Sequence, residues 1–133
     1  MAAAARRGPV LGMKIALVAV AGAAGALARY GIAVAVGVRA FPWSTLGINV
    51  TGSFLLGLLV HTGIERGWPE TTTVPLAAGF LGAFTTYSTF SNETFELLRA
   101  DRAGTAALYL TASIGGGLLA AAAGYALARA VSS

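Results

Sequence analysis

The sequence contains no cysteine and only one histidine, His61. Without cysteine there is no disulfide and no thiolate metal site, and a single histidine excludes most zinc sites. One histidine near the end of an apolar segment, with no acid beside it, is also a poor set for acyl-transfer catalysis. We therefore expect neither a disulfide-stabilised scaffold nor an enzyme.

Charge is also scarce, because charged residues make up 11% of the 133 residues, whereas soluble domains carry about 25%. The nine Lys and Arg residues give a net charge of +4, but they are scattered over connections and chain ends. Such a distribution fits charges flanking membrane spans and not a nucleic-acid interface. Hydrophobic residues reach 56%, so the composition favours an integral membrane protein.

Three apolar segments are long enough to cross a bilayer as helices. They are residues Ile15–Val36, Leu46–Ile64 and Thr105–Leu127. With the segment that starts at Val74 they predict an all-α membrane domain of four transmembrane helices over residues 13–133. Residues 1–12 lack the apolar core of a secretory signal, and we expect them to be a flexible N-terminal extension.

The segment from Val74 to Leu98 changes character halfway along. Its apolar run to Phe84 is eleven residues, which as a helix covers about 16 Å of a core that measures about 30 Å. From Thr85 the sequence becomes rich in hydroxyl groups. Irregular backbone at membrane depth is tolerated where it lines a wet cavity, and broken helices bind ions in transport proteins. We predict a break near Gly82 and Thr85.

Beyond this break, Ser91 or Asn92 can restart or extend a helix that leaves the membrane. The acidic residues that follow, Glu93 and Glu96, are then expected at the membrane interface.

Arg29 is the only charge inside the first segment. Its side chain can extend to the interface, or it can face inward and pair with a backbone carbonyl or a carboxylate. Sequence alone leaves both alternatives open. Gly22 and Gly25 on the same segment offer a small-residue face to a neighbouring helix.

A polar stripe follows one face of the second segment at helical spacing. It consists of Asn49, Ser53, Gly57 and His61, and it is either hydrogen-bonding contact between helices or the wall of a polar path. His61 is expected to be solvated or packed.

The chemistry of the candidate path residues favours an ion without selecting its sign. The amide of Asn49 and the hydroxyls of Ser88, Thr89 and Ser113 are neutral donors, and aromatic ring edges carry partial positive charge. These groups favour a small anion. Carbonyls freed near Gly82 and Thr85 would favour a small cation.

The positive-inside bias that normally fixes orientation is nearly absent. One side of the predicted bundle holds five basic residues (Arg6, Arg7, Lys14, Arg66 and Arg129), and the other holds three (Arg39, Arg99 and Arg102) or four with Arg29. A chain of this kind can insert in both orientations. Four short spans are also too few to enclose a pore, so we expect an oligomer, most simply a dimer.

These residues resemble the Fluc/CrcB family of fluoride channels. The likeness is carried by four motifs: Gly22-x-x-Gly25-Ala26-x-x-Arg29-Tyr30, Asn49-x-x-Gly52-Ser53-Phe54-x-x-Gly57, Gly79-Phe80-x-Gly82-x-x-Thr85-Thr86-Tyr87-Ser88-Thr89-Phe90, and Tyr109-x-x-x-Ser113. It covers roughly residues 13–130. The string around Thr85 is specific, whereas the small-residue motifs by themselves are not.

The resemblance implies an antiparallel, dual-topology homodimer that exports fluoride passively through two pores in a prokaryotic inner membrane. It further implies that Asn49 donates to fluoride, that the rings of Tyr87 and Phe90 coordinate it edge-on, and that Ser113 belongs to a polar track. Ser88, Thr89 and Tyr109 complete the expected pore set, and Arg29 is expected to be structural. A central structural Na⁺ is expected on the carbonyl oxygens of Gly82 and Thr85.

The family pattern has phenylalanine at the first ring of the third segment, where this chain has Tyr87. The added hydroxyl needs a partner, so one fluoride contact is expected to differ. The alternative to a fluoride channel is a small dual-topology, four-span antiporter for cations or drugs. An antiporter of that kind would need a membrane-embedded acid in the first segment, and residues 15–36 contain none.

Overall fold

The computed structural model describes residues 2–132, with side chains described from Gly8 onward. Three long helices are α1 (Ala2–Val36), α2 (Trp43–Glu65) and α6 (Ala103–Ser132). Between α2 and α6 lie α3 (Glu70–Val74), the π-helix η1 (Pro75–Leu81), α4 (Gly82–Phe84) and α5 (Tyr87–Arg99). The elements of this described range are all helical, as predicted.

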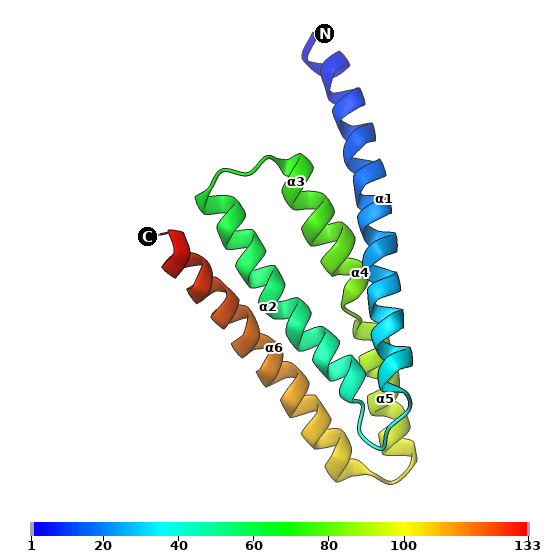
Figure 1. Ribbon diagram of the computed structural model, residues 1–133. Helices are drawn as coiled ribbons and strands as arrows, with labels where there is room; N and C mark the ends of the chain where they lie inside the picture. The colour runs from blue at the N-terminus through cyan, green and yellow to red at the C-terminus, as the bar shows by residue number, and fades with distance from the viewer. Residues whose placement is uncertain (1, 133) are drawn as a thin grey trace.

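Consecutive passes of the chain run in alternating directions along one bundle (Figure 1). Helix α6 packs along α2, while the segment α3–η1–α4 lies between α2 and α1 and packs mainly on α1. The α1–α2 connection and the α5–α6 turn therefore meet at one end of the bundle, opposite the C-terminal end of α6. This arrangement places the interrupted segment in contact with both α1 and α2.

The long helices extend beyond the limits predicted from hydropathy. Helix α1 begins at Ala2 and not at Ile15, so its backbone runs as helix through most of the predicted N-terminal extension. Helix α2 begins one residue after Pro42, a position where proline is tolerated because it lacks an N–H group. The proposed domain boundary at residue 13 stays a prediction.

Glycines allow the helices to approach closely. A Cβ atom added at Gly25 would lie 2.1 Å from the carbonyl oxygen of Phe80, and one added at Gly124 would lie 2.1 Å from that of Phe54. Gly57 faces the Ala121 carbonyl in the same way, at 2.3 Å. Small residues permit such backbone contacts in membrane proteins. The small-residue face predicted at Gly25 is therefore confirmed as a packing surface.

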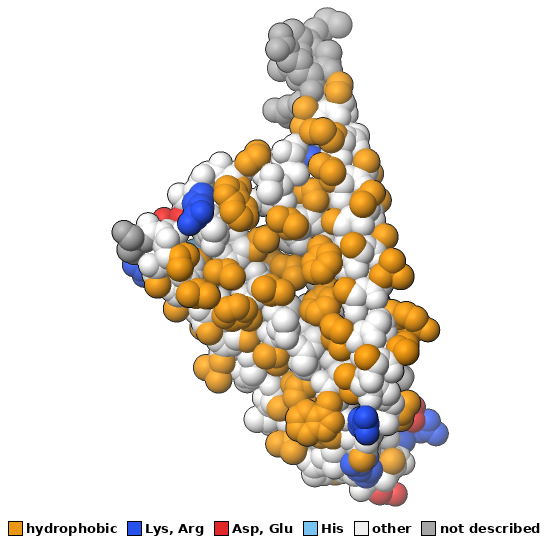
Figure 2. All heavy atoms as spheres, viewed as in Figure 1, with side chains coloured by type: hydrophobic (Ala, Val, Ile, Leu, Met, Phe, Trp, Pro, Cys, Tyr) orange, Lys and Arg blue, Asp and Glu red, His pale blue; other side chains and the backbone are white. Residues whose placement is uncertain are grey.

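The surface of the bundle is apolar. Helices α2, α6 and the part of α1 from Gly8 are each long and apolar enough to cross a membrane, and Val20 and Leu119 are more than 70% exposed. Figure 2 shows hydrophobic side chains covering the middle of one face, with charged side chains toward the ends. A soluble protein rarely exposes so large an apolar surface, so the chain is a multi-pass membrane protein.

Candidate functional site

The helix between α2 and α6 is interrupted at Thr85 and Thr86. Both residues have extended backbone, with φ and ψ of −79° and 157° at Thr85 and of −148° and 113° at Thr86. Upstream, Pro75 begins a seven-residue π-helix, a wide turn that is frequent at functional sites. The break predicted near Gly82 and Thr85 is confirmed, and it lies directly after the helical residues Gly82–Phe84. The helix restarts at Tyr87, so of the two alternatives given for Ser91 and Asn92 the structure shows extension of a helix and not a new start. The hydroxyl of Thr86 caps the new helix by accepting from the N–H of Thr89.

Asn49 holds the interrupted backbone from the neighbouring helix α2. Its Nδ2 donates to the Thr86 carbonyl at 3.0 Å, and its Oδ1 accepts from the Thr86 N–H at 2.8 Å. The side-chain amide thus satisfies both backbone groups of a residue that is outside any helix. Since the amide NH₂ group carries two protons, one remains for another acceptor. Asn49 is fixed in orientation by these two bonds.

The break frees carbonyl groups from their usual helical partners. In a continuous helix, the N–H of Thr86 would bond to Gly82 and the N–H of Thr89 would bond to Thr85. Here the Thr86 N–H donates to Asn49 and the Thr89 N–H donates to the Thr86 hydroxyl at 3.3 Å. The carbonyls of Gly82 and Thr85 are therefore released, and these are the two groups predicted to hold a cation.

Arg29 occupies a third carbonyl at the break. Its Nε donates to the Ala83 carbonyl at 3.1 Å, in a partly buried position. Of the two alternatives left open for Arg29, the inward-facing one is confirmed, with a backbone carbonyl as its partner. This bond distinguishes the Ala83 carbonyl from those of Gly82 and Thr85.

A cleft of about 520 Å³ lies beside the break, and we call it the break cleft. It is lined by fourteen residues, none of which is charged. Six of the predicted site residues lie in this lining: Asn49, Gly82, Thr85, Tyr87, Phe90 and Ser113. The Oγ of Ser113 is buried and has no hydrogen-bond partner among the described residues. The break cleft therefore combines neutral donors with ring surfaces.

The two rings predicted on the third segment are adjacent. The ring centroids of Tyr87 and Phe90 are 6.1 Å apart, with the planes inclined at 54°. Tyr87 is 81% exposed, so the rest of the chain leaves most of this residue uncovered. Ser88 and Thr89 do not line the break cleft; their hydroxyls approach that of Thr86 at 3.4 and 3.0 Å. These two residues therefore sit at the helix cap.

Tyr109 also lies outside the lining of the break cleft. It is completely buried, and its hydroxyl donates to Oε2 of Glu93 at 2.7 Å. The other carboxylate oxygen of Glu93 accepts from the Thr45 hydroxyl at 3.0 Å. These two donors hold the half-buried side chain of Glu93 between α2 and α6, whereas that of Glu96 is exposed. That both carboxylates lie at the membrane interface stays a prediction.

The polar stripe on α2 divides into two parts. Asn49 and Ser53 line the break cleft, whereas Gly57 and His61 pack against α6. The His61 ring meets that of Tyr125 edge-on at 4.0 Å, so the packing role expected for His61 is confirmed. The stripe is thus a cleft wall near the break and a helix contact further along.

A helix broken beside an uncharged polar cleft, within an apolar bundle, defines a membrane protein built to handle a small ion. The sequence matches the family described as CrcB-like protein, Camphor Resistance (CrcB), over residues 16–125. This chain therefore belongs to the CrcB family.

The sequence of this chain aligns with those of its relatives over nearly their whole length. The chain is 47% identical over 116 residues to fluoride-specific ion channel FluC 2 of Geobacillus kaustophilus, covering 84% of this chain and 90% of that protein. It is 48% identical over 121 residues to FluC 1 of Symbiobacterium thermophilum, covering 86% and 97%. A FluC channel of Thermus thermophilus is 44% identical over 118 residues, covering 86% and 93%.

Sequence reasoning missed the partners of Glu93 and the part that Thr86 plays. Thr45 is one turn before Asn49 on the same face of α2, a spacing that extends the polar stripe by one residue. This signal was present in the sequence. By contrast, the pairing of Asn49 with Thr86 depends on the distance between two segments and had no local signal.

Proposed function

We propose that this chain is a fluoride-selective channel that lowers cytoplasmic fluoride by passive export across the inner membrane of a prokaryote. The proposal is supported by relatives that are named as fluoride-specific ion channels. The observation that carries it is the lining of the break cleft, which offers hydrogen-bond donors and ring surfaces with no carboxylate. These groups attract an anion in the break cleft, and no fixed negative charge in its lining repels it.

Fluoride must exchange its water shell for protein donors as it enters. The remaining Nδ2 proton of Asn49 is one such donor, and the unpartnered hydroxyl of Ser113 is another. The edges of the Phe90 and Tyr87 rings add partial positive charge. Because no full positive charge lines the break cleft, binding is weak enough for release, as conduction requires.

The alternative, a cation or drug antiporter, has less support. Coupled cation transport uses a carboxylate at membrane depth, and the break cleft contains none. Glu93 is the nearest candidate by sequence, and two hydrogen-bond donors already engage it. Measuring the current through purified protein in a planar bilayer distinguishes a channel from a coupled antiporter. We expect a voltage-driven fluoride current without a proton gradient; strictly proton-coupled exchange would overturn the channel proposal.

We propose that two copies assemble as an antiparallel homodimer in the lipid membrane. The break cleft is open on one side, where Tyr87 is 81% exposed, so a second copy would close it. The near-equal basic charge at the two ends allows both orientations. The absence of cysteine permits single labels at opposite ends, R66C and A103C. Dual topology predicts that an impermeant reagent labels about half of each variant; full labelling of one and none of the other would contradict it.

We also propose a structural Na⁺ on the carbonyl oxygens of Gly82 and Thr85. These groups fit a hard cation, because oxygen ligands released from helical bonding are the donors such ions prefer. A two-fold related copy would supply the same pair. Replacing Na⁺ by a large organic cation should lower the melting temperature of purified wild-type protein, since a ligand that binds only the folded state stabilises it. An unchanged melting temperature would contradict the site.

A further inference from the structure

A group of polar side chains lies near the C-terminal ends of α2 and α6, which pack together at one end of the bundle (Figure 1). It consists of His61 on α2 and of Tyr125 and Arg129 on α6, and we call it the α2–α6 cluster. The rings of His61 and Tyr125 meet edge-on, with centroids 4.0 Å apart. The guanidinium of Arg129 lies 5.9 Å from the centroid of the Tyr125 ring, and its Nη1 donates to the Tyr125 hydroxyl at 3.5 Å. Tyr125 therefore joins a histidine and an arginine from different helices.

The length of α6 places this cluster close to the lipid headgroups. The helix has 30 residues, which cover about 45 Å, and a bilayer with its headgroups measures roughly 40–45 Å. Arg129 lies in the last turn of α6, and Tyr125 lies one turn earlier. Tyrosine is enriched at this level of a membrane, and arginine side chains extend toward it. The cluster is therefore placed to meet the phosphate groups of lipids.

The side chains of the cluster offer several hydrogen-bond donors to such a phosphate. Arginine binds phosphate through two parallel N–H bonds. The Tyr125 hydroxyl accepts from Arg129, and no described residue accepts its own proton. A neutral imidazole carries one N–H group, and the ring nitrogens of His61 have no hydrogen-bond partner in the part of the chain that the structure describes. Tyr125 and Arg129 are also exposed, so a ligand can reach them.

The charge around the α2–α6 cluster favours an anion. The carboxylate nearest to His61 along the chain is that of Glu65, one turn further along α2 and exposed. No described hydrogen bond or ion pair joins Glu65 to the cluster. Arg66 adds a second exposed cation at the same end of α2. A phosphate bound at the cluster therefore has Arg129 in contact and Arg66 nearby.

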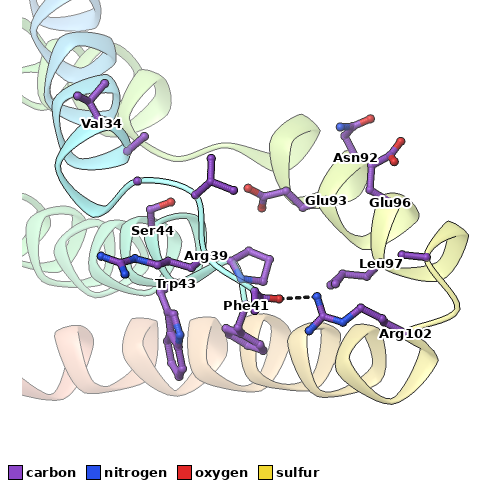
Figure 3. Close-up of a pocket in the computed structure, with 16 residues that line it drawn as sticks. Val34, Arg39, Phe41, Trp43, Ser44, Asn92, Glu93, Glu96, Leu97 and Arg102 are labelled. Atoms are coloured by element: carbon purple, nitrogen blue, oxygen red, sulfur yellow. Dashed lines mark hydrogen bonds between the residues drawn. The ribbon is translucent and has the colours of Figure 1, made fainter.

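The opposite end of the bundle differs in charge and in the use of its arginines. A cleft of about 730 Å³ lies there, and its lining includes two carboxylates, those of Glu93 and Glu96 (Figure 3). Arg39 and Arg102 line the same cleft, but each donates to a backbone carbonyl. The two carboxylates repel an anion, so this end is a poor place for a lipid phosphate.

We infer that the α2–α6 cluster binds the phosphate group of an anionic phospholipid, so that one lipid bridges the ends of α2 and α6. Arg129 supplies the positive charge and two donors, and Tyr125 and His61 supply one donor each. None of the three residues lines the break cleft. The inference is therefore independent of the proposed fluoride conduction, and it concerns the surface of the bundle that faces lipid.

The single histidine of the chain provides the test, because the imidazole of His61 gives one NMR signal set in untagged protein. The experiment records this signal in nanodiscs of phosphatidylcholine that is replaced stepwise by phosphatidylglycerol, at constant pH. We expect the wild-type signal to shift and the shift to saturate. R129Q should raise the phosphatidylglycerol fraction for half-saturation by about fivefold, the factor that one arginine near the surface contributes to anionic-lipid binding.

R66Q is the matched control, since it removes an exposed arginine from the same end of the bundle without touching the cluster. Its half-saturation should stay within about twofold of wild type. Equal effects of R129Q and R66Q would indicate general attraction to surface charge and overturn the site. A wild-type signal that does not move in phosphatidylglycerol would overturn it as well.

Two further measurements complete the test. Inorganic phosphate added to pure phosphatidylcholine nanodiscs should cause no saturating shift of the His61 signal; a saturating shift would assign the site to a free anion and overturn the lipid assignment. Phosphatidylglycerol should also raise the melting temperature of wild type more than that of R129Q, because a ligand that binds only the folded state stabilises it. Equal rises in the two proteins would contradict binding at Arg129.

Discussion

Two hydrogen bonds join the side-chain amide of Asn49 to the backbone N–H and carbonyl of Thr86, a residue outside any helix. The bond from Thr86 N–H to Asn49 Oδ1 also releases the Gly82 carbonyl. One contact between α2 and the break therefore serves both predicted ion sites. It orients the Asn49 amide toward the break cleft, and it leaves the Gly82 carbonyl available to bind a cation.

Replacing Asn49 by aspartate tests this pair. N49D keeps the acceptor for the Thr86 N–H, but it loses the donor to the Thr86 carbonyl and introduces an anion into an uncharged cleft. We expect fluoride efflux to fall by at least about a hundredfold, which is the size of effect seen when one oriented donor is removed from an anion site. Liposome efflux checks this, with N92D as the control on the exposed face of α5. Efflux of N49D near the wild-type level would remove Asn49 from the pathway.

Replacing Phe90 by isoleucine tests the ring edges. Isoleucine is apolar and smaller, so F90I removes both the partial positive rim and the edge contact with Tyr109. We expect flux to fall by roughly two- to tenfold, because such aromatic contacts contribute about 0.5–1.5 kcal/mol and each 1.36 kcal/mol is about tenfold in rate. F95I is the matched control, since Phe95 lies on the same helix and is 57% exposed. Equal losses in F90I and F95I would indicate general damage to α5 and contradict a role for the ring.

The sequence predicted the helical class, the three long apolar helices and the break because each has a local signal. The apolar run ending at Phe84 is too short to cross a membrane, and hydroxyl-rich residues follow it. The environment of Glu93 could not be predicted in this way. Its place on a helix that leaves the membrane suggested an interface, but its hydrogen bonds to Thr45 of α2 and Tyr109 of α6 depend on how three helices pack.

The same contrast applies to Ser88 and Thr89. As hydroxyl residues next to the break they are good candidates for an ion path, yet a helix that restarts needs its first N–H groups satisfied. Thr86 meets this need for Thr89, and the neighbouring hydroxyls gather around the cap. Capping and ion binding use the same residue types, so composition alone does not separate them.

Gly25 provides a test of the packing between α1 and η1. A methyl group added there would overlap the Phe80 carbonyl, and overpacking of this kind costs about 1–3 kcal/mol. We expect the melting temperature of G25A to fall by roughly 3–10 °C. G31A is the matched control on the same helix, because nothing lies within 4 Å of its added Cβ and alanine favours helix over glycine. A melting temperature for G25A at or above that of G31A would contradict the close contact.

Lys14 and Glu70 form an ion pair between α1 and the start of α3. The hydrogen bond from Lys14, and then its charge, lower the pKa of Glu70 below its usual value of 4.5. A lowered pKa means that the pair adds stability above about pH 4.5 and loses it as the pH falls through the pKa of the folded state. Because Glu70 is exposed, the effect is small.

This pair predicts a pH-dependent difference between wild type and E70Q. The wild-type melting temperature should be slightly higher near neutral pH, and the two should converge as the medium becomes acidic. Melting curves in a pH series measure this difference. A gap that widens toward acidic pH would reverse the sign and contradict the pairing.

The most direct test of the whole account is to compare fluoride with chloride efflux from liposomes that contain the purified, folded wild-type protein. An uncharged cleft of oriented donors beside a broken helix should release fluoride rapidly while the same vesicles retain chloride. Vesicles that keep both ions, or that lose chloride as fast as fluoride, would contradict it.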